Sequence, residues 1–334
     1  MTQLCVIPGD GIGQEVVPVA VRVLERLVPD LRVIHASAGW ECFQSCGESV
    51  PAATIETLRN CGAGLFGAVS SPAYAVPGYR SAILTLRQAL QLGVNLRPVR
   101  SWPGVSSKSA VDLLILRENS EGLYVGREHM ATPDLAIAER HISRQASERL
   151  ARFAADIATQ RGSRRITLVH KANILPLTCG LFRDSCRAVL RSRGLEALVD
   201  ERLVDVAALQ LVEQPEAFDL LLTTNLFGDV LSDLASHWGG GLGMAPSLNC
   251  GEGLALAEPV HGSAPDIVGT GRANPLAAVL SAGLLLRYHW RATTQADRLE
   301  QVVARLLADM GGEELGTATT LTIEKALLAE LERA

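Results

Sequence analysis

The sequence contains few lysines, no long apolar run and no strong excess of either charge. Of its 31 basic residues, only Lys108, Lys171 and Lys325 are lysines. No uninterrupted apolar run approaches the ~18–20 residues that a membrane-spanning helix requires. A formal net charge of −5 over 334 residues argues against a general nucleic-acid-binding protein. We therefore expect no membrane and no nucleic acid among the partners, and a lysine inside a motif becomes a candidate functional residue.

The cysteines and the first residues predict a cytoplasmic protein. The seven cysteines are an odd number and lack Cys-x-x-Cys spacing, which is typical of reduced thiols in a cytosolic protein. Residues 1–8 contain no basic region and lead at once into an apolar segment, so no secretory signal is expected.

Apolar periodicity predicts an α/β protein with a largely parallel sheet, because predicted strands alternate with predicted helices. The length exceeds one typical domain and suggests two. The predicted strands are 3–8, 31–37, 63–69, 111–117, 165–170 and 218–224. The predicted helices are 12–27, 52–60, 81–92, 143–161, 178–193, 226–238, 275–290 and 295–310. Residues 135–142 alternate weakly and predict an extra strand that projects from the body as a dimer contact.

Two carboxylates stand four residues apart just after a predicted strand. Asp229 and Asp233 would share one face of the helix that follows residues 218–224. Ligands bind at this end of an α/β sheet, and Mg²⁺ prefers carboxylate oxygens. A pair of solvated helix acids is the alternative interpretation.

The glycine cluster at 8–13 resembles a dinucleotide-binding fingerprint only superficially. The full Gly-x-Gly-x-x-Gly spacing is missing, and Asp10 would repel a pyrophosphate. A tight turn that needs positive φ explains these glycines without a ligand.

Several polar residues are candidate functional residues only when they are considered together. Arg87, Arg97 and Arg117 stand on separate elements and could converge on a small acid with two or three carboxylates, or remain isolated surface residues. Lys171 follows an apolar strand, where a desolvated amine could act as a base. Residues 258–266 read by themselves as a polar loop.

Together these segments resemble the β-decarboxylating dehydrogenases, the family of isocitrate, 3-isopropylmalate and homoisocitrate dehydrogenases. The matching motifs span 117–124, 170–173, 223–233 and 258–266, and the resemblance covers nearly the whole chain. It implies a two-domain α/β fold with a mostly parallel sheet and an active site in the interdomain cleft. The implied domains are 1–95 with 249–334 on the cofactor side, and 96–248 for metal, substrate and dimerisation.

The resemblance also implies the reaction, which is NAD-dependent oxidative decarboxylation of a 3-carboxy-2-hydroxy acid. C2 is oxidised by hydride transfer and CO₂ then leaves C3. Mg²⁺ or Mn²⁺ would be held by Asp229 and Asp233, with Asp205 from the other subunit. Lys171, also from the partner, would remove the hydroxyl proton, and Tyr124 would return a proton to C3. A homodimer with shared active sites follows, with a tetramer as the alternative.

The resemblance assigns residues to two pockets. The predicted substrate-binding residues are Ser71, Arg80, Ser81, Leu84, Arg87, Arg97, Arg117, Tyr124, Lys171 and Asn173. The predicted cofactor-binding residues are Ser70, Asn225, Glu258, His261, Gly262, Ser263, Ala264, Asp266 and Asn274. NAD is predicted over NADP because the Asp266 carboxylate can accept a hydrogen bond from a ribose 2′-hydroxyl and repels a 2′-phosphate.

Residues 81–84, at the start of a predicted helix, indicate which acid is oxidised. Ser81 fits isocitrate enzymes, whereas the apolar pair Ile83 and Leu84 fits 3-isopropylmalate enzymes, which generally carry Asp where this chain has His170. The segment looks most like homoisocitrate dehydrogenases, some of which pair an Ile with a neighbouring aliphatic residue, whereas others place an Arg where this chain has Leu84. We therefore predict conversion of homoisocitrate to 2-oxoadipate in lysine biosynthesis, with Ile83 and Leu84 facing the C3 substituent and Arg80 near the end of its arm. The alternatives are 3-isopropylmalate and isocitrate.

A non-catalytic, nucleotide-binding regulatory subunit is the alternative from another functional class. Silent subunits of this family typically lose a metal aspartate, the tyrosine or the lysine. This chain retains Asp205, Asp229, Asp233, Tyr124 and Lys171, which favours an active oxidoreductase.

Overall fold

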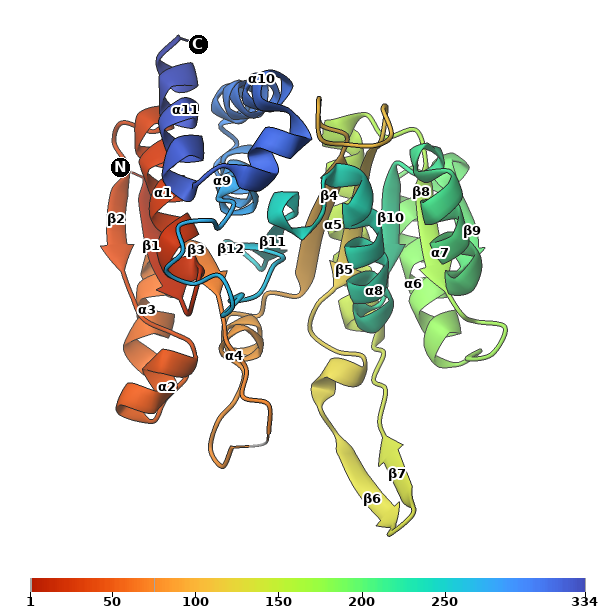
Figure 1. Cartoon of the computed structure of the whole chain (residues 1–334). Coiled ribbons are helices and arrows are strands. Elements are labelled where there is room, and N and C mark those ends of the chain that lie inside the picture. The colour runs from red at the N-terminus through yellow and green to blue at the C-terminus, as the bar shows by residue number, and fades with distance from the viewer. Residues whose placement is uncertain (1, 75, 334) are drawn as a thin grey trace. The chain divides into compact units, whose positions relative to one another are not determined.

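A computed structural model describes residues 2–74 and 76–333. The chain divides into two compact units. The first comprises Met1–Leu92, Ser101–Ser109 and Gly239–Ala334, and the second comprises Gly93–Arg100 and Ala110–Trp238. Both units combine helices with mostly parallel strands (Figure 1), so the predicted α/β fold class is confirmed.

The first unit arranges its strands in the order β2-β1-β3-β12-β11. Strands β2, β1, β3 and β12 run parallel, and β11 pairs antiparallel with β12. Its strands are β1 (Gln3–Gly9), β2 (Arg32–His35), β3 (Ala63–Ala68), β11 (Pro246–Cys250) and β12 (Ala255–Pro259). Its helices are α1 (Gly13–Leu27), α2 (Trp40–Cys46), α3 (Ala52–Cys61), α4 (Ala82–Ala89), α9 (Leu276–Leu284), α10 (Thr293–Thr317) and α11 (Thr320–Arg333).

Helices cover both faces of the first unit's sheet. Every residue of β3 is buried, as expected for a central parallel strand. On one face, Phe66 of β3 packs with Leu58 of α3 and Leu86 of α4 in an apolar core. Helices α1 and α9 pack against each other and against the strands.

The second unit arranges its strands in the order β4-β5-β10-β8-β9. Strands β5, β10, β8 and β9 run parallel, and β4 pairs antiparallel with β5. The strands are β4 (Val94–Arg100), β5 (Asp112–Glu118), β8 (Ile166–His170), β9 (Val199–Leu203) and β10 (Leu220–Thr223). The helices are α5 (Arg144–Arg161), α6 (Thr178–Ser192), α7 (Val204–Glu213) and α8 (Asn225–Ser236).

Helix α5 shows how the sequence sets its ends. The Ser143 side chain accepts a hydrogen bond from the backbone N–H of Ala146, which satisfies a free donor of the first turn. Gly162 ends the helix at φ 66°, a conformation that glycine adopts without a Cβ penalty. The predicted range of 143–161 therefore agrees with the structure to one residue.

A separate hairpin of the second unit is formed by β6 (Glu128–Thr132) and β7 (Leu135–Ala138). All residues of both strands are exposed, and the hairpin extends away from the helices of its unit (Figure 1). The prediction of an extra strand is confirmed, although the strand ends at Ala138 instead of residue 142.

Some predicted elements require correction. Predicted helix 275–290 is α9 followed by a π-helical turn, Leu285–His289. Predicted helix 295–310 extends over Thr293–Thr317 and is interrupted at Gly311, where φ is 69° and ψ is 170°. The predicted loop 258–266 begins inside β12, because Glu258 still pairs with Ser247 of β11.

The turn at residues 8–13 has the predicted backbone. Gly9 and Gly11 have φ values of 74° and 55°. A Cβ at Gly9 would lie 2.0 Å from the carbonyl oxygen of Ala68, so only glycine fits this approach. No helix within residues 2–74 and 76–333 is long and apolar enough to cross a membrane.

Candidate functional site

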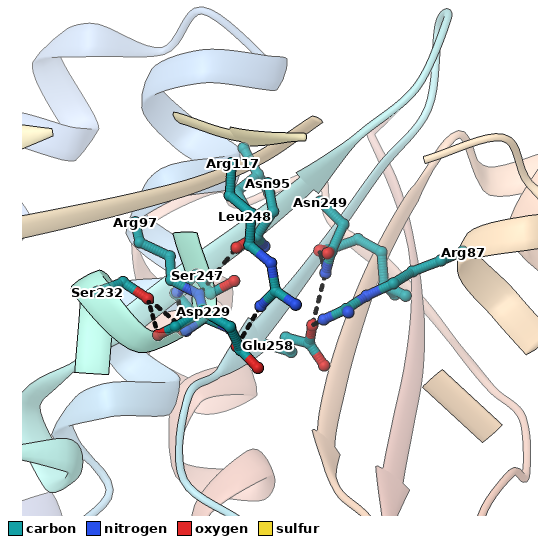
Figure 2. A network of polar contacts seen from close by, with 12 residues as sticks. Arg87, Asn95, Arg97, Arg117, Asp229, Ser232, Ser247, Leu248, Asn249 and Glu258 are labelled. Carbon is teal, nitrogen blue, oxygen red and sulfur yellow. Dashed lines mark hydrogen bonds and ion pairs between the residues drawn. The ribbon is translucent and has the colours of Figure 1, made fainter. Parts of the chain in front are cut away.

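Asp229 and Asp233 lie one turn apart on α8, which begins just after β10. Arg97 of β4 contacts both carboxylates. Its Nη2 lies 3.3 Å from Oδ1 of Asp229, and its Nη1 donates to Oδ1 of Asp233 at 3.0 Å. The same Nη1 donates to Oγ of Ser232 at 2.7 Å (Figure 2). The two predicted metal ligands therefore share one buried guanidinium.

Arg117 of β5 reaches the same carboxylate and is only 1% exposed. Its Nη1 is hydrogen-bonded to Oδ1 of Asp229, and its Nε and Nη2 donate to Oδ1 of Asn225 at 3.1 and 2.7 Å. Helix α8 can lie this close to β5 because Gly228 has no side chain. A Cβ at this position would lie only 2.7 Å from the Arg117 Cβ. Removing the partner of a buried charge typically costs about 3–5 kcal/mol, so Asp229 also stabilises this unit.

Tyr124 completes the convergence on Asp229. Its hydroxyl is hydrogen-bonded to Oδ2 of Asp229, and the Arg117 guanidinium carbon lies 5.0 Å from the centre of its ring. Burial raises the pKa of Tyr124, and the hydrogen bond to Asp229 raises it further. The phenol therefore keeps its proton and is available as a proton donor.

Asp229 and Asp233 offer oxygen ligands of the kind that Mg²⁺ and Mn²⁺ accept. Burial raises the pKa of Asp233, although the nearby Arg97 charge opposes this shift. Among the described residues, no group of three His, Cys, Asp or Glu side chains is placed to hold a metal ion. The two carboxylates fit a site for such an ion, because Mg²⁺ is usually held by one or two carboxylates while water or substrate supplies the remaining oxygens.

The predicted third carboxylate, Asp205, pairs with the predicted base. Lys171 follows β8 and Asp205 lies in the first turn of α7, and the two side chains form an ion pair. The hydrogen bond from Lys171 is the main cause that lowers the pKa of Asp205. Since β8 and β9 are neighbouring parallel strands, the elements that follow them bring both groups together.

His170 fixes the turn that carries Lys171. Its ring is 5% exposed, its Nδ1 accepts a hydrogen bond from the backbone N–H of Ala172 at 3.2 Å, and its Nε2 lies 3.2 Å from Oε2 of Glu201. Predicted substrate residue Asn173 is exposed on the same turn.

Arg87 lies in the first unit and is bound to a second carboxylate. Its Nη2 donates to Oε1 of Glu258 at 2.9 Å, and Nδ2 of Asn249 donates to the same oxygen at 2.7 Å (Figure 2). The Nε of Arg87 is buried and has no hydrogen-bond partner among the described residues. This N–H could bind a further acceptor, such as a ligand carboxylate.

Three loops meet around Ser263 in the first unit. Ser70 Oγ donates to Ser263 Oγ at 2.9 Å, and the backbone N–H of Ile12 donates to the Ser263 carbonyl at 3.0 Å. These loops follow β3, β12 and β1, whose carboxyl ends lie at one sheet edge because the strands are parallel. The structure therefore brings predicted cofactor residues Ser70 and Ser263 together.

His261 leaves one ring nitrogen open to a ligand. Its Nδ1 lies 3.0 Å from the carbonyl oxygen of Gly262, and its Nε2 is buried without a partner among the described residues. Burial lowers the pKa of His261 and so favours the neutral ring. A Cβ at Gly262 would meet no atom within 4 Å, which leaves room for a ligand beside the loop. These features fit a bound dinucleotide.

The remaining predicted cofactor residues have different surroundings. Asp266 is exposed, and Ala264 has a positive φ of 40° in the same loop. Asn274 accepts a hydrogen bond from the backbone N–H of Leu276 at 3.0 Å and so supports the start of α9. Asn225 is buried in the second unit, where its Nδ2 donates to the Glu121 carbonyl at 2.9 Å.

The residues predicted to select the substrate surround the start of α4. Ser71 and Arg80 are exposed, and Ser81 and Leu84 are half-buried. Ile83 packs against the apolar core of the first unit. Ile83 is itself only half-buried, so its place beside Leu84 facing the substrate stays a prediction.

Two buried asparagines were missed by the sequence analysis. Asn95 accepts from Nε of Arg97 at 2.8 Å, and Asn249 donates to Glu258. Both stand in strands between apolar neighbours, and both are fully buried. A polar residue inside an apolar strand was the available signal, because a buried amide needs partners.

The chain matches the family described as "Isocitrate/isopropylmalate dehydrogenase" over residues 3–325. It is 48% identical to an isocitrate/homoisocitrate dehydrogenase of Thermus thermophilus, with 97% of this chain and 98% of that protein covered. It is 44% identical to a 3-isopropylmalate dehydrogenase of Methanothermobacter thermautotrophicus, with coverage of 94% and 95%. The crystal structure of isocitrate dehydrogenase from Methylococcus capsulatus superposes with a TM-score of 0.93 at 38% identity, with 99% of each chain covered.

Proposed function

Because the chain belongs to the isocitrate/isopropylmalate dehydrogenase family of oxidoreductases, we propose that it catalyses NAD-dependent oxidative decarboxylation of a 3-carboxy-2-hydroxy acid. The observation that carries the proposal is the convergence of Arg97, Arg117 and Tyr124 on Asp229. Two cations, a proton donor and a carboxylate in one place can bind an anionic substrate and move its protons.

Arginines bind the carboxylates of the acid. A guanidinium donates two parallel hydrogen bonds to a carboxylate, so Arg97 and Arg117 can exchange part of their bonding to Asp229 for bonds to substrate. In the first unit, the buried Nε of Arg87 has no hydrogen-bond partner among the described residues and is a donor that suits a carboxylate.

A divalent cation, Mg²⁺ or Mn²⁺, would be held by Asp229 and Asp233 of one chain and Asp205 of a second copy. The chemistry supplied by bound NAD and a bound cation is hydride acceptance and polarisation of the C2 oxygen. A cation bound by Asp229 would weaken the bonds of this carboxylate to Arg97 and Arg117, and both guanidinium groups could then bind a substrate carboxylate.

Lys171 and Tyr124 move the protons. The Lys171 amine takes the proton of the C2 hydroxyl as hydride leaves C2. Loss of CO₂ from the C3 carboxylate leaves an enolate, and Tyr124 gives its phenolic proton to C3, which yields the 2-oxo acid and a phenolate that solvent reprotonates. The raised pKa of Tyr124 keeps that proton in place until this step.

The loop that follows β12 supports NAD as the cofactor. Its exposed Asp266 carboxylate suits a ribose 2′-hydroxyl and disfavours the 2′-phosphate of NADP. His261 Nε2 and the open space beside Gly262 provide the rest of the fit.

An apolar face on the second unit supports a homodimer. Leu226, Val230 and Leu234 recur at the spacing of one face of α8 and are all exposed, with Val230 61% exposed. Leu209 on the adjacent helix α7 is 57% exposed. Such apolar side chains on packed neighbouring helices are typical of an interface. A two-fold dimer through this face would place Asp205, also on α7, near the partner's site.

Homoisocitrate is our proposed substrate, and the reaction would then serve lysine biosynthesis. Leu84 and Arg87 stand three residues apart on α4 and so share a face, which places an aliphatic wall beside a carboxylate-binding cation. Homoisocitrate carries one more methylene than isocitrate, and burying a methylene contributes ~0.8 kcal/mol, about fourfold in kcat/KM. The exposed Arg80 supplies a cation for the terminal carboxylate of the arm.

We expect kcat/KM for NADH formation to be highest with homoisocitrate when homoisocitrate, isocitrate and 3-isopropylmalate are assayed in parallel. Leu84→Arg should shift the ratio toward isocitrate by roughly tenfold, because a charged hydrogen bond contributes about 1.5–3 kcal/mol before solvent screening is considered. Arg80→Ala should lower the preference for homoisocitrate over 3-isopropylmalate.

Leu84→Met is the matched control, because it keeps an aliphatic side chain of similar size. A best rate with 3-isopropylmalate, or an Arg80→Ala variant with unchanged ratios, would refute the proposed specificity while leaving the reaction class intact.

A further inference from the structure

Two neighbouring thiols stand on α2, one helical turn apart. The Sγ atoms of Cys42 and Cys46 are 3.8 Å apart, Cys46 is exposed and Cys42 is half-buried. Cys5, Cys179, Cys186 and Cys250 are buried. Burial raises the pKa values of Cys5 and Cys250 to about 12, which keeps these thiols unreactive. A reagent in solution therefore reaches the pair on α2 more readily than the buried thiols.

The helix must change shape if these two sulfurs bond. Residues four apart on a helix have Cβ atoms about 5–6 Å apart, whereas a disulfide needs about 3.5–4.5 Å. Cys46 is the last residue of the seven-residue helix α2, and Gly47 follows at φ 82°. A short helix end next to glycine can rearrange at low cost, so bond formation is feasible and distorts the last turn.

This last turn is packed against the segment that precedes α4. Phe43 lies between the two cysteines in sequence and stacks on Trp40 with ring centres 5.6 Å apart. Tyr79 packs edge-on against both rings, at 5.1 Å from Trp40 and 5.3 Å from Phe43. The Tyr79 hydroxyl donates to the Ser70 carbonyl at 3.1 Å. A shift of Phe43 therefore reaches Ser70 through Tyr79.

A buried carboxylate provides a second connection between α2 and Ser70. Asp10, 1% exposed, accepts hydrogen bonds from the backbone N–H groups of Trp40 and Glu41 at 2.8 and 3.0 Å. It also accepts one from the backbone N–H of Ser70 at 2.8 Å. The start of α2 and the loop after β3 are thus held by the same side chain.

We propose that Cys42 and Cys46 form a redox-sensitive dithiol that a small-molecule disulfide oxidises, and that the resulting bond displaces Ser70, Tyr79 and the residues that lead from Tyr79 into α4. The effect on catalysis rests on the proposed function, because the sequence predicts that Ser70 binds the cofactor and that Ser71, Arg80 and Ser81 bind the substrate. The oxidation itself does not depend on that function.

The chemistry proceeds by two thiol exchanges. The exposed Cys46 thiolate attacks one sulfur of the small disulfide and releases one thiol equivalent. The Cys42 sulfur then attacks Cys46 Sγ, forms the intramolecular bond and releases the second. The two cysteines lose two protons and two electrons, which the small disulfide takes up as two thiols. Burial and the neighbouring Cys46 thiol raise the pKa of Cys42 to about 11, and the contribution of that thiol ends once Cys46 enters the mixed disulfide.

The first test measures oxidation directly. The full chain is incubated with oxidised glutathione, the remaining thiols are alkylated under denaturing conditions, and the tryptic peptide 33–59 is weighed; it contains Cys42 and Cys46 and no other cysteine. We expect an unalkylated peptide about 2 Da lighter than the dithiol form, because two hydrogens are lost. Recovery of only alkylated peptide, or of a stable glutathione adduct, would overturn the proposal.

The second test measures the displacement. Hydrogen exchange in residues 70–82 should rise on oxidation and return after dithiothreitol treatment, whether or not the enzyme is assayed. The kcat/KM should fall by about tenfold or more, because misplacing binding groups by about an ångström can cost up to 10²-fold.

The variants separate this pair from the other thiols. Cys46→Ser should abolish both responses, and Cys61→Ser, which changes another partly accessible thiol, should retain them. Oxidised peptide with unchanged exchange in residues 70–82 would refute the connection to this segment. Changed exchange in a chain that oxidises no acid would refute the proposed function instead.

Discussion

Asp229→Asn should lower kcat/KM by about 10²–10³-fold and raise the Mg²⁺ concentration needed for half-maximal rate, because electrophilic stabilisation by a cation contributes several kcal/mol. The substitution keeps the shape of the side chain and removes the charge that Arg97, Arg117 and Tyr124 share. The measurement is the initial rate over a range of Mg²⁺ concentrations.

Asp184→Asn is the matched control for Asp229→Asn. Asp184 is an exposed carboxylate of the same unit that pairs with its neighbour Arg183, so its loss should leave the Mg²⁺ profile unchanged. Thermal unfolding of both variants separates lost catalysis from lost stability, since Arg117 loses a charged partner only in Asp229→Asn. Wild-type rates at low Mg²⁺ in a folded Asp229→Asn variant would show that this carboxylate binds no metal.

Lys171→Ala and Tyr124→Phe should each lose about 10²–10⁴-fold in rate, which is the usual contribution of one proton-transfer group. Mixed after dissociation and reassociation, the two variants should recover about a quarter of wild-type activity. Half of the dimers are then heterodimers, and each heterodimer combines Tyr124 of one chain with Lys171 of the other in one of its two sites.

The control for this complementation is a mixture of two preparations of Lys171→Ala, which can form no intact site. Subunit exchange is confirmed by mass, with one chain tagged. Parental activity in a mixture that has demonstrably exchanged would mean that each site takes both residues from one chain.

The placement of Asp229 and Asp233 on one helix face could be predicted, because it depends only on their spacing in the sequence. A four-residue spacing after an apolar strand places both carboxylates on one helix face. Their arginine partners depend on strand pairing instead, in which Asn95 of β4 stands opposite Arg117 of β5. The sequence identifies Arg97 and Arg117 as candidate binding residues. That both contact Asp229 depends on the register between β4 and β5, in which paired residues lie about 20 positions apart in the sequence.

Strand β9 and helix α2 could not be predicted from the sequence because few of their side chains are buried. Every residue of β9 is only partly buried, and α2 has no buried residue at all. Both lack the apolar periodicity on which sequence reasoning relies. β4 was missed for the opposite reason, because its buried Asn95 and Arg97 interrupt the apolar run that would mark a strand.

Ile83 and Leu84 show the limit of sequence patterns at a specificity site. Both residues are aliphatic, adjacent on α4 and half-buried, and Ile83 also packs against the core of the first unit. Ile83 and Leu84 stand four and three residues before Arg87, so helical spacing places both of them on the side of α4 that carries Arg87. The motif identifies the segment, and which of the two side chains faces a substrate stays a prediction.

The central claim concerns the reaction, and product analysis tests it most directly. The purified chain, supplied with homoisocitrate, NAD and Mg²⁺, should release NADH and CO₂ in equal amounts while 2-oxoadipate accumulates. NADH without CO₂, CO₂ without NADH, or no turnover of homoisocitrate, isocitrate and 3-isopropylmalate with NAD would contradict the account.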